Sequence, residues 1–398
     1  MGWIEKNLRK LFDKPRSHFE PGGRLQKLGP LFEAIEDVFF FPSEATENRP
    51  LVRDSLDLKR FMSSVLVALI PPLLFGIYNT GYQSRLASDL STSFLPVVST
   101  GLMIVLPVII VSYAVGLFWE ILFAAVRRHP ISEGFLVTGL LFPLTLPPSI
   151  PLWQVAVGIT FGVVIGKEVF GGTGRNLFNP ALTARAFIFF AYPAQMSGDP
   201  VWIAVRKGAD RAVDAVTGPT PLAVTELQSP FNSIQEMLAD RGYTFTKLLI
   251  GNYPGTIGGT SALCAAAGAL LLIILGIASW RIIAGCIAGL IATGFLLNLF
   301  AGPQALPWFS VSPFYHLAAG GFAFGAAYMA TDPVTAPGTD RARWIYGFLI
   351  GALTILIRVV NPAFPEGIML AILFMNMFSP LLEYTDIRLR VKKRVSHV

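Results

Sequence analysis

The sequence predicts an all-α protein that crosses a membrane about ten times. Of its 398 residues, 53% are hydrophobic and 14% are charged, and the mean hydropathy is +0.58. Such a chain cannot present an ordinary charged surface to water. Apolar runs recur that are long enough for a helix to cross a hydrocarbon core of about 30 Å, and basic residues gather in alternate connections between them. Lipid is therefore expected to cover much of the surface.

Ten apolar runs are the predicted membrane helices. They comprise residues 61–79, 100–126, 134–149, 152–170, 180–194, 262–279, 282–301, 314–330, 344–361 and 366–384. The third and fifth runs are short for a crossing and contain proline, namely Pro143, Pro147, Pro148 and Pro180. Because proline interrupts helical hydrogen bonding, these two runs are expected to be broken or partial crossings.

The charges of the connections test this count independently, because cytoplasmic loops collect Lys and Arg while short outer loops do not. Basic residues precede the first run and follow the second, fourth, sixth, eighth and tenth runs. The turns at 146–152 and 301–308 carry no charge, and Arg85 is the only basic residue at 80–95. Both termini are therefore expected to be cytoplasmic. The net charge of +6 reflects these segments and gives no reason to expect nucleic acid as a partner.

Five runs precede a long loop and five follow it, which divides the chain into two membrane halves. The expected parts are an N-terminal segment (1–57), a first half (58–194), a periplasmic loop (195–260), a second half (261–385) and a basic cytoplasmic tail (386–398). Repeats with an odd number of crossings must be inverted, as in urea-channel-like folds. Binding sites are then expected at broken helices in corresponding positions, here the breaks near Gly171 and Asp332.

The N-terminal segment is expected to be cytoplasmic and amphipathic, and no signal peptide is predicted because a long polar stretch precedes the first run. Two stretches repeat apolar residues at helical spacing, the pattern of a helix in the membrane interface. The first contains Trp3, Ile4, Leu8, Leu11 and Phe12, and the second contains Leu31, Phe32, Ile35, Val38 and Phe39. A membrane-surface anchor and a flap over a ligand site both fit this pattern.

Metal chemistry has little support in the sequence. The two cysteines, Cys264 and Cys286, lie within predicted runs, so a disulfide framework is not indicated and a four-thiolate iron–sulfur cluster within the chain is excluded. Of the four histidines only His316 enters a run, which does not favour a bis-His haem. If the chain carries electrons, its own cofactor is expected to be something other than a metal.

The first polar stretch at membrane depth ends the second apolar run. Glu120 follows the aromatic residues Phe118 and Trp119 there. A carboxylate is costly in hydrocarbon and often lines a cavity or binds a ligand. A glutamate that reaches the membrane interface would fit equally well, so both interpretations stay open.

The second polar stretch, residues 167–180, is a glycine-rich bend between two runs. Glycine permits positive φ and lets the backbone approach a ligand closely. Asn176 and Asn179 offer both donors and acceptors, as an isoalloxazine or pyrimidine edge would need. No predicted strand precedes the bend, so it is not a nucleotide-binding fingerprint. A tight re-entrant turn with capping asparagines is the alternative.

The third polar stretch, residues 329–337, places Asp332 where the eighth run breaks. A carboxylate beside hydroxyl and carbonyl groups is hard-oxygen chemistry that suits sodium. The residues alone favour a cap for the next turn, and a place on a cation path is the alternative hypothesis. Glu383 and Asp386, near the end of the last run, are ambiguous in the same way.

The long loop contains residues 214–223, which propensity alone would describe as a proline turn. This segment resembles the Ser/Thr-Gly-Ala-Thr-x-Leu-Ala signature at which bacterial respiratory flavoproteins carry FMN on the second threonine, here Thr220. Pro219 replaces the usual alanine and leaves the acceptor hydroxyl in place. Further segments are similar to the B-subunit family of sodium-translocating NADH:quinone oxidoreductases, the NqrB/RnfD family. They are residues 18–23, 52–60, 171–180, 329–334 and 361–367.

This resemblance covers essentially the whole chain and implies a redox subunit of a respiratory sodium pump in the bacterial inner membrane. Electrons from NADH would enter at another subunit, reach a covalent FMN in this one and pass through riboflavin to ubiquinone while sodium crosses. The implied partners are the other members of a six-subunit complex, including a periplasmic FMN subunit and an NADH-oxidising subunit with FAD and an iron–sulfur cluster. No side chain is expected to act as a nucleophile in turnover.

The resemblance also implies roles for particular residues. Thr220 would carry FMN through a phosphoester, and Asn176 and Asn179 would contact riboflavin. The quinone-reduction region would include the second run's residues Gly116, Leu117 and Glu120, with Leu117 where a second glycine is expected. Asp332 is the hypothesis for the sodium path.

Two alternatives from other classes remain. One is the D subunit of a ferredoxin-dependent Rnf complex, which resembles this chain around the flavin motif and against which the long N-terminal extension argues. The other is a small-solute channel or transporter, since two inverted five-helix halves would suit it as well. The transporter alternative predicts no covalent flavin.

Overall fold

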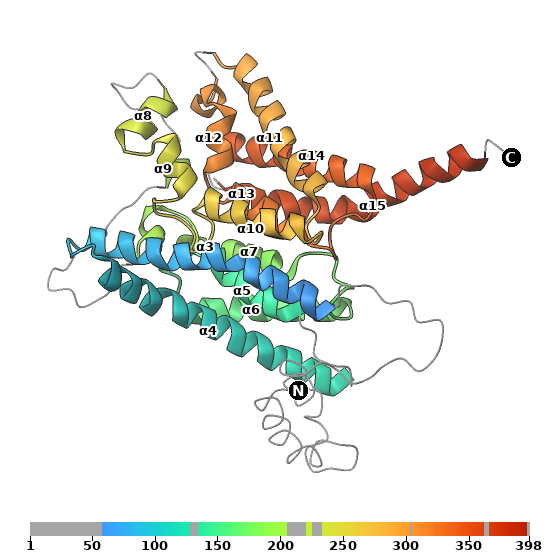
Figure 1. The fold of residues 1–398 in the computed structure, drawn as a ribbon, viewed down its shortest axis with the longest axis horizontal. Helices are drawn as coiled ribbons and strands as arrows, with labels where there is room; N and C mark the ends of the chain where they lie inside the picture. Colours follow the sequence, from blue (N-terminus) through green and yellow to red (C-terminus); the bar gives the residue numbers. More distant parts are fainter. Residues whose placement is uncertain are drawn as a thin grey trace, which may run out of the picture.

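The computed structural model describes residues 58–127, 134–204, 220–224, 233–302, 305–361 and 366–395, and every regular element within these ranges is helical (Figure 1). Within these ranges, six helices are long and apolar enough to cross a membrane, three in each half of the chain. They are Phe61–Ala87, Phe94–Arg127, Leu152–Phe170, Trp280–Leu299, Asp340–Val360 and Ile368–Lys393. The all-helical, polytopic membrane class is confirmed. The count of ten crossings stays a prediction, and the proposed N-terminal helices lie outside the described residues.

The first half contains five apolar helices, each overlapping a predicted run. They are α3 (Leu58–Ala87), α4 (Phe94–Arg127), α5 (Gly134–Leu144), α6 (Leu152–Val164) and α7 (Pro180–Ala191). Helix α3 continues eight residues beyond its predicted end at residue 79 because its polar side chains find partners. Asn79 donates to the carbonyl of Tyr253 at 3.0 Å, and Gln83 donates to Asn252 at 3.1 Å. Sequence hydropathy alone could not reveal these long-range partners.

The second half also contains five predicted runs, but the third of them, which is the eighth run of the chain, is broken. Its elements are α10 (Ala262–Ile274), α11 (Trp280–Leu299), α12 (Pro313–Ala318), α13 (Phe322–Phe324), a π-helical turn η7 (Gly325–Met329), α14 (Asp340–Val360) and α15 (Ile368–Val395). Gly320 and Gly321 separate α12 from α13 at φ values of +66° and +68°. This left-handed backbone suits glycine and stops a helix.

The two halves share part of their helix pairing. The second helix of each half packs against the fourth, and the fourth packs against the fifth, as α4–α6–α7 and α11–α14–α15. Similar tripeptides, 145–147 and 331–333, follow the third elements. The break at Gly171 precedes the fifth helix, whereas the break at Asp332 precedes the fourth. These two breaks are therefore not in corresponding positions, and that part of the repeat prediction is wrong.

The helix ends fall into two groups that match the alternation of loop charge. Ends with basic residues pair with one another, as Arg127 with Glu168 at 3.1 Å. The uncharged turn after α5 instead joins the long loop, because Ile257 N–H donates to the carbonyl of Leu146 at 3.0 Å and Ser149 donates to that of Val201 at 2.6 Å. The contacts therefore join basic ends to one another and the uncharged turn to the long loop.

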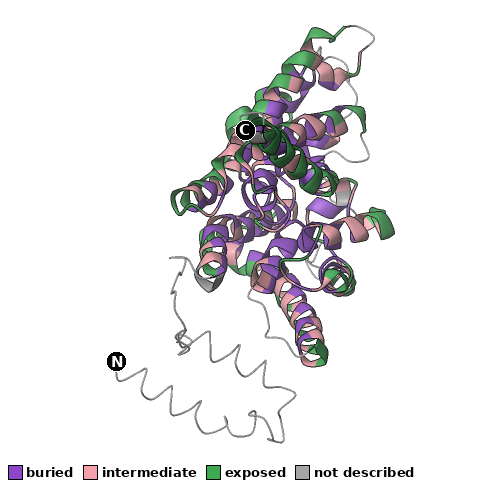
Figure 2. Ribbon diagram, turned by 90° about the vertical axis from the view of Figure 1, so that its right-hand side faces the viewer, coloured by how far each residue is buried: buried purple, intermediate pink, exposed green. Residues whose placement is uncertain are grey.

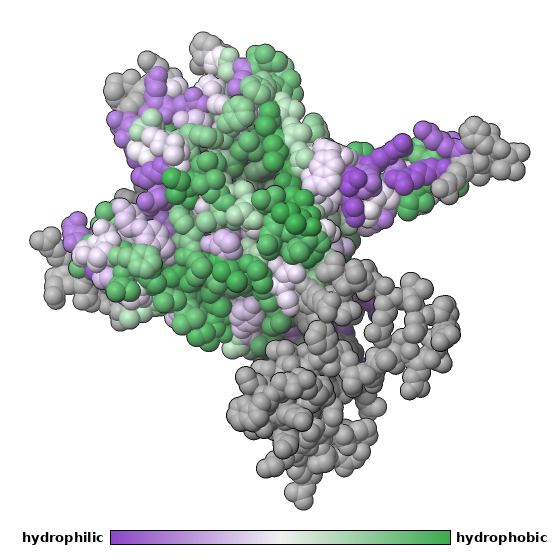
Figure 3. All heavy atoms as spheres, in the orientation of Figure 1, coloured by the Kyte–Doolittle hydropathy of each residue, from purple (hydrophilic) through white to green (hydrophobic). Residues whose placement is uncertain are grey.

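Buried residues gather in the middle of the molecule and exposed residues lie on the outer helices (Figure 2), and many of the exposed residues are large and apolar. Leu95 is 76% exposed and Leu299 is 81% exposed. One face of the molecule is mostly apolar, while hydrophilic residues gather on α8 (Ile234–Asp240) and at the end of α15 (Figure 3). An apolar outer surface of this kind is expected for helices in contact with lipid.

Candidate functional site

Two of the cavities that adjoin helix α7 contain predicted site residues. One lies at its N-terminus and is called the amide pocket here, defined by Thr138, Lys167, Thr173, Asn176, Asn179 and Asp332. The other, called the Thr220 cavity, is lined by Leu182, Arg185, Ala186 and Phe189 of α7 and by Thr220. A single helix of 12 residues thus carries side chains of both cavities.

Glycines shape the bend that forms one wall of the amide pocket. Gly171, Gly172 and Gly174 have φ values of +111°, +95° and +88°, which confirms the expectation that this bend uses positive φ. Asn179 caps α7, because its Oδ1 accepts from the backbone N–H groups of the second and third residues after it at 3.0 and 3.3 Å. The cap uses two donors that a helix N-terminus otherwise leaves unsatisfied. The capping interpretation therefore holds for Asn179.

Asn176 and Thr173 are the pocket residues with hydrogen-bonding capacity to spare. Asn176 donates from Nδ2 to the carbonyl of Phe178 at 2.9 Å, and no described residue donates to its Oδ1. The hydroxyl of Thr173 is buried without a partner among the described residues. Buried polar atoms are normally hydrogen-bonded, so these two groups are the ones positioned to meet a ligand.

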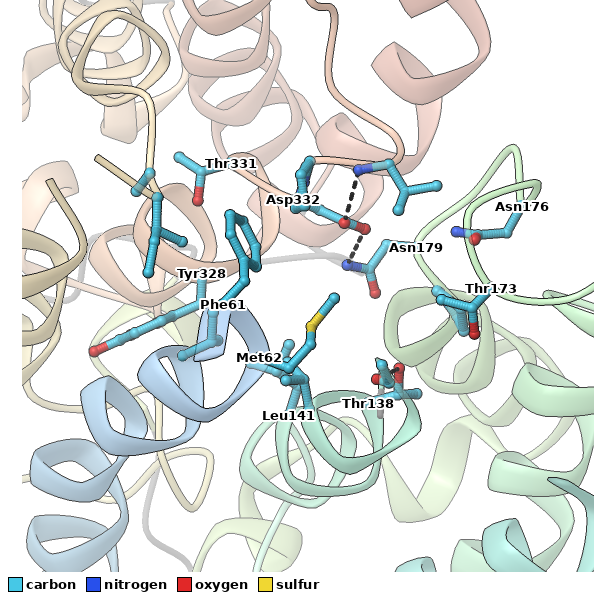
Figure 4. A pocket seen from close by; sticks show the side chains of 18 of the residues that line it. Phe61, Met62, Thr138, Leu141, Thr173, Asn176, Asn179, Tyr328, Thr331 and Asp332 are labelled. Carbon is cyan, nitrogen blue, oxygen red and sulfur yellow. Dashed lines mark hydrogen bonds between the residues drawn. The ribbon is translucent and has the colours of Figure 1, made fainter. Parts of the chain in front are cut away.

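Asp332 joins the two halves of the fold in this pocket (Figure 4). Its carboxylate accepts from Asn179 Nδ2 at 3.1 Å, from the hydroxyl of Thr335 at 3.2 Å and from the N–H of Val334 at 3.2 Å. The bond to Val334 confirms the interpretation of Asp332 as a cap. Asp332 lies between η7 and α14, where burial raises the pKa of its carboxyl and the three hydrogen bonds oppose that rise.

A buried cluster of charges lies behind the amide pocket. Lys167 lines the pocket and forms an ion pair with Glu120 of α4, and its ammonium is 3.9 Å from Glu168. Arg127 pairs with Glu168 at 3.1 Å. Glu120 is 2% exposed, so the alternative that it reaches the membrane interface is wrong for the chain by itself. Two acids and two bases balance here, which is how buried charge is tolerated.

The other predicted quinone residues have different surroundings. Gly116 is buried against α5, and a methyl group there would lie 2.2 Å from the ring of Phe135. Leu117, the next residue, is half-buried. Gly116 thus permits close packing of α4 on α5, and Glu120 one turn later is linked through Lys167 to the amide pocket.

The Thr220 cavity has a volume of about 320 Å³. Thr220 is 9% exposed and precedes a short 3₁₀ turn, η5 (Pro221–Ala223). Its hydroxyl makes no cap hydrogen bond. The remaining polar lining residues are Arg185, Ser197, Asp199 and Glu366. Arg185 pairs with Glu366, while its buried Nε has no partner among the described residues. Thr217 and Pro219 of the motif lie outside the described residues.

Sequence reasoning assigned no role to the buried basic residues Lys167, Arg185 and Arg358. Arg358 donates to the carbonyls of Ala319 at 2.9 Å and of Glu366 at 2.9 Å, and so satisfies backbone groups at the break after α12. A signal existed, because Arg185 and Arg358 lie inside apolar runs, where charged residues are rare and usually paired.

The chain is similar to known membrane proteins along almost its whole length. The model of the NQR2, RnfD, RnfE family matches residues 45–391. The B-type subunit of the Na(+)-translocating NADH-quinone reductase from Ectopseudomonas mendocina (strain ymp) is 47% identical over 412 aligned positions, covering 98% of this chain and 99% of the relative. Proteins of the same description from Chromohalobacter salexigens and Klebsiella pneumoniae (strain 342) are each 44% identical and cover 98% of this chain and 96% and 99% of their own lengths.

Proposed function

The chain belongs to the NQR2, RnfD, RnfE family as a B-type subunit of a Na(+)-translocating NADH-quinone reductase, and from this premise we propose that it holds flavins in two sites joined by α7. FMN would be linked to Thr220 and riboflavin would lie at the amide pocket. The observation that carries the proposal is that α7 contributes to both cavities, to the amide pocket at its N-terminus and to the Thr220 cavity along one face. Arg185 follows Asn179 by six residues, about 9 Å along a helix axis.

The Thr220 cavity fits a flavin mononucleotide in size and chemistry. Its volume of about 320 Å³ lies within the range of about 300–1,000 Å³ that small-molecule sites occupy. Its walls are mostly apolar, as a ring system requires, and the unpartnered Nε of Arg185 is a donor that a ligand would satisfy. Thr220 lines the cavity with a hydroxyl that is not needed as a helix cap.

The hydrogen-bonding groups of the amide pocket suit the polar edge of a flavin. Thr173 and Asn176 have a hydroxyl and a carbonyl oxygen to spare, which suit the polar edge of an isoalloxazine. Its free volume is about 70 Å³, so this chain alone accommodates the edge of a ring rather than the whole of it. Phe61 and Met62 of α3 also line the pocket, and we propose that their side chains move when the whole ring enters.

A bound flavin supplies the chemistry that no side chain here can, because it accepts two electrons and releases them singly. The protein fixes the positions of the two sites and their electrostatics. Lys167 connects the amide pocket to Glu120, which we propose acts with Gly116 and Leu117 in reduction of ubiquinone. Asp332 hydrogen-bonds to Asn179 in the same pocket, and this contact supports the proposal that sodium passage responds to the state of that site.

We propose a topology in which the Thr220 cavity lies on the periplasmic side. Uncharged connections meet the long loop, whereas basic ends pair with one another, and the rule that basic loops stay inside supports cytoplasmic termini in a bacterial inner membrane. As a B-type subunit the chain has other subunits of the reductase as partners. We propose that a periplasmic flavoprotein subunit delivers electrons to the Thr220 cavity and that the NADH-oxidising subunit lies upstream of it.

The attachment of FMN at Thr220 is tested by in-gel fluorescence and peptide mass analysis of the denatured protein, expressed with a flavin transferase. Wild type should give a fluorescent band with the mass of FMN on the peptide that contains Thr220. Thr220→Ala should give no such band, since the acceptor hydroxyl is gone. Thr244→Ala, which removes a helix cap in the same loop, should retain the band.

A wild-type protein without flavin would contradict the proposal and favour the small-solute transporter. Flavin on both Thr220→Ala and wild type would place the attachment on another residue. The D-type subunit of an Rnf complex would give the same band, but oxidation of NADH with sodium-stimulated quinone reduction by the assembled complex distinguishes the two.

A further inference from the structure

We propose that Arg185 is the cation that sets the redox potential of the flavin on Thr220 and that Glu366 holds Arg185 in place. This inference rests on the proposed function of the Thr220 cavity and adds a role for two residues that no sequence motif assigns. It concerns positioning and electrostatic tuning, and it requires no bond to form or break at either residue.

The face of α7 toward the cavity shows which part of a ligand Arg185 meets. Leu182, Arg185, Ala186 and Phe189 line the cavity at successive spacings of three, one and three residues, which is one face of a helix. Arg185 is thus the charged member of an otherwise apolar wall. A planar ring would lie against this wall, whereas the phosphate would stay with Thr220 on the loop.

Arg185 is built into the cavity rather than free in solvent. The residue is 6% exposed and its Nε has no partner among the described residues. It is also the sole basic side chain among the described residues that line this cavity. An unsatisfied donor on a buried cation is costly, and an acceptor atom of a bound ring would remove that cost.

Glu366 fixes the guanidinium from the second half of the fold. Its carboxylate pairs with Arg185 Nη2, and its own backbone carbonyl accepts from Arg358 Nε at 2.9 Å. Arg358 belongs to α14 and Arg185 to α7, so Glu366 ties the cation to both halves. The pairing uses Nη2 and leaves Nε for the cavity.

The sign of the effect follows from charge. A reduced flavin ring carries more negative charge than an oxidised one, and a fixed positive group in a site with little water stabilises that charge strongly. Arg185 therefore raises the potential of the flavin, whereas Glu366 and Asp199, which also line the cavity, lower it. Removal of the cation should favour the oxidised ring.

The test is a spectroelectrochemical titration of the covalently bound FMN, followed in the assembled complex. Arg185→Gln removes the charge and keeps N–H donors. At a fixed potential its ratio of reduced to oxidised FMN should fall at least about tenfold, which is about 30 mV for a two-electron couple. Glu366→Gln should shift the ratio in the opposite direction, and Arg185→Lys should remain closer to wild type than Arg185→Gln.

Arg281→Gln is the matched control, because Arg281 forms an ion pair with Asp340 at 3.3 Å and lies outside the cavity lining. The redox potential of the FMN in this variant should equal that in wild type. Covalent flavin at wild-type potential in Arg185→Gln would overturn the inference and leave the proposed function intact. Arg185→Gln could fail to carry flavin. In that case the inference is overturned if the flavin potentials of both Arg185→Lys and Glu366→Gln equal that of wild type. Absence of flavin from wild type would refute the proposed function itself.

Discussion

Lys167 is 3% exposed, yet it lies between the carboxylates of Glu120 and Glu168 and also lines the amide pocket. A buried ammonium retains its charge only where opposite charge compensates the lost hydration. The residue therefore serves packing and electrostatics together. A change of charge at the pocket would therefore also change the electrostatic environment of Glu120, because Lys167 contacts both.

Lys167→Met should destabilise the protein by about 3–5 kcal/mol, because it removes the cation from beside a buried carboxylate while keeping the side-chain length. The double variant with Glu120→Leu should recover most of this loss, since the carboxylate that pairs with Lys167 is then gone and Glu168 keeps its ion pair with Arg127. Apparent unfolding midpoints in detergent provide the measurement. Equal stability of wild type and Lys167→Met would show that the pair contributes little.

Asp332→Asn tests the proposed sodium path. We expect sodium-stimulated quinone reduction to fall and the sodium concentration for half-maximal rate to rise, because a neutral amide attracts the cation less than a carboxylate. Thr335→Val is the control, since it removes one hydrogen bond to the same carboxylate and keeps the charge. If both variants lower stability and neither changes the sodium dependence, Asp332 acts as a cap alone.

At the scale of elements, the side chains of the candidate sites come mainly from places where helices end or are interrupted. The amide pocket is formed where α6, α7 and η7 end or begin, and the loop that bears Thr220 rests on the break between α12 and α13. Gly320 illustrates this contact, because a Cβ there would lie 2.1 Å from a methyl of Leu222. Membrane proteins tolerate irregular backbone where protein, not lipid, surrounds it.

Gly320→Ala should displace the loop of Thr220 and reduce the yield of covalent flavin. The substitution strains a left-handed backbone by about 1–2 kcal/mol and also collides with Leu222. Gly276→Ala is matched to it, because Gly276 has a similar φ of +70° and open space around it. Fluorescence per protein should fall in the first variant and not in the second. Similar yields in both would mean that the loop does not depend on this contact.

The sequence predicted the helical membrane class and the approximate places of the apolar helices, apart from the break in the eighth run, because hydropathy and loop charge are local signals. It also predicted that the glycine-rich bend uses positive φ. It could not predict that Asn179 and Asp332 meet, since they are 153 residues apart and join different halves. The roles of Lys167 and Arg185 were missed for the same reason, as their partners Glu120 and Glu366 come from distant helices and segments.

At the scale of the whole molecule, α7 contributes residues to two cavities that differ in chemistry. The amide pocket offers neutral donors and acceptors beside a balanced charge cluster, whereas the mostly apolar Thr220 cavity has one cation, Arg185, and two carboxylates, Asp199 and Glu366, among its described lining residues. Both cavities take residues from the two halves of the chain, so their relative position depends on how the halves pack. A flavin in each cavity would place one redox group at the N-terminus of α7 and the other along one face of the same helix.

The most direct test of this account is a count of flavins per chain after acid precipitation of the purified complex and separation of this subunit. FMN should remain covalently attached to the wild-type chain, and riboflavin should be released. Asn176→Leu should lose the released riboflavin and keep the FMN, whereas Thr220→Ala should lose the FMN and keep the riboflavin. Loss of both flavins together in either variant, with the helical content unchanged, would contradict two separate sites on α7.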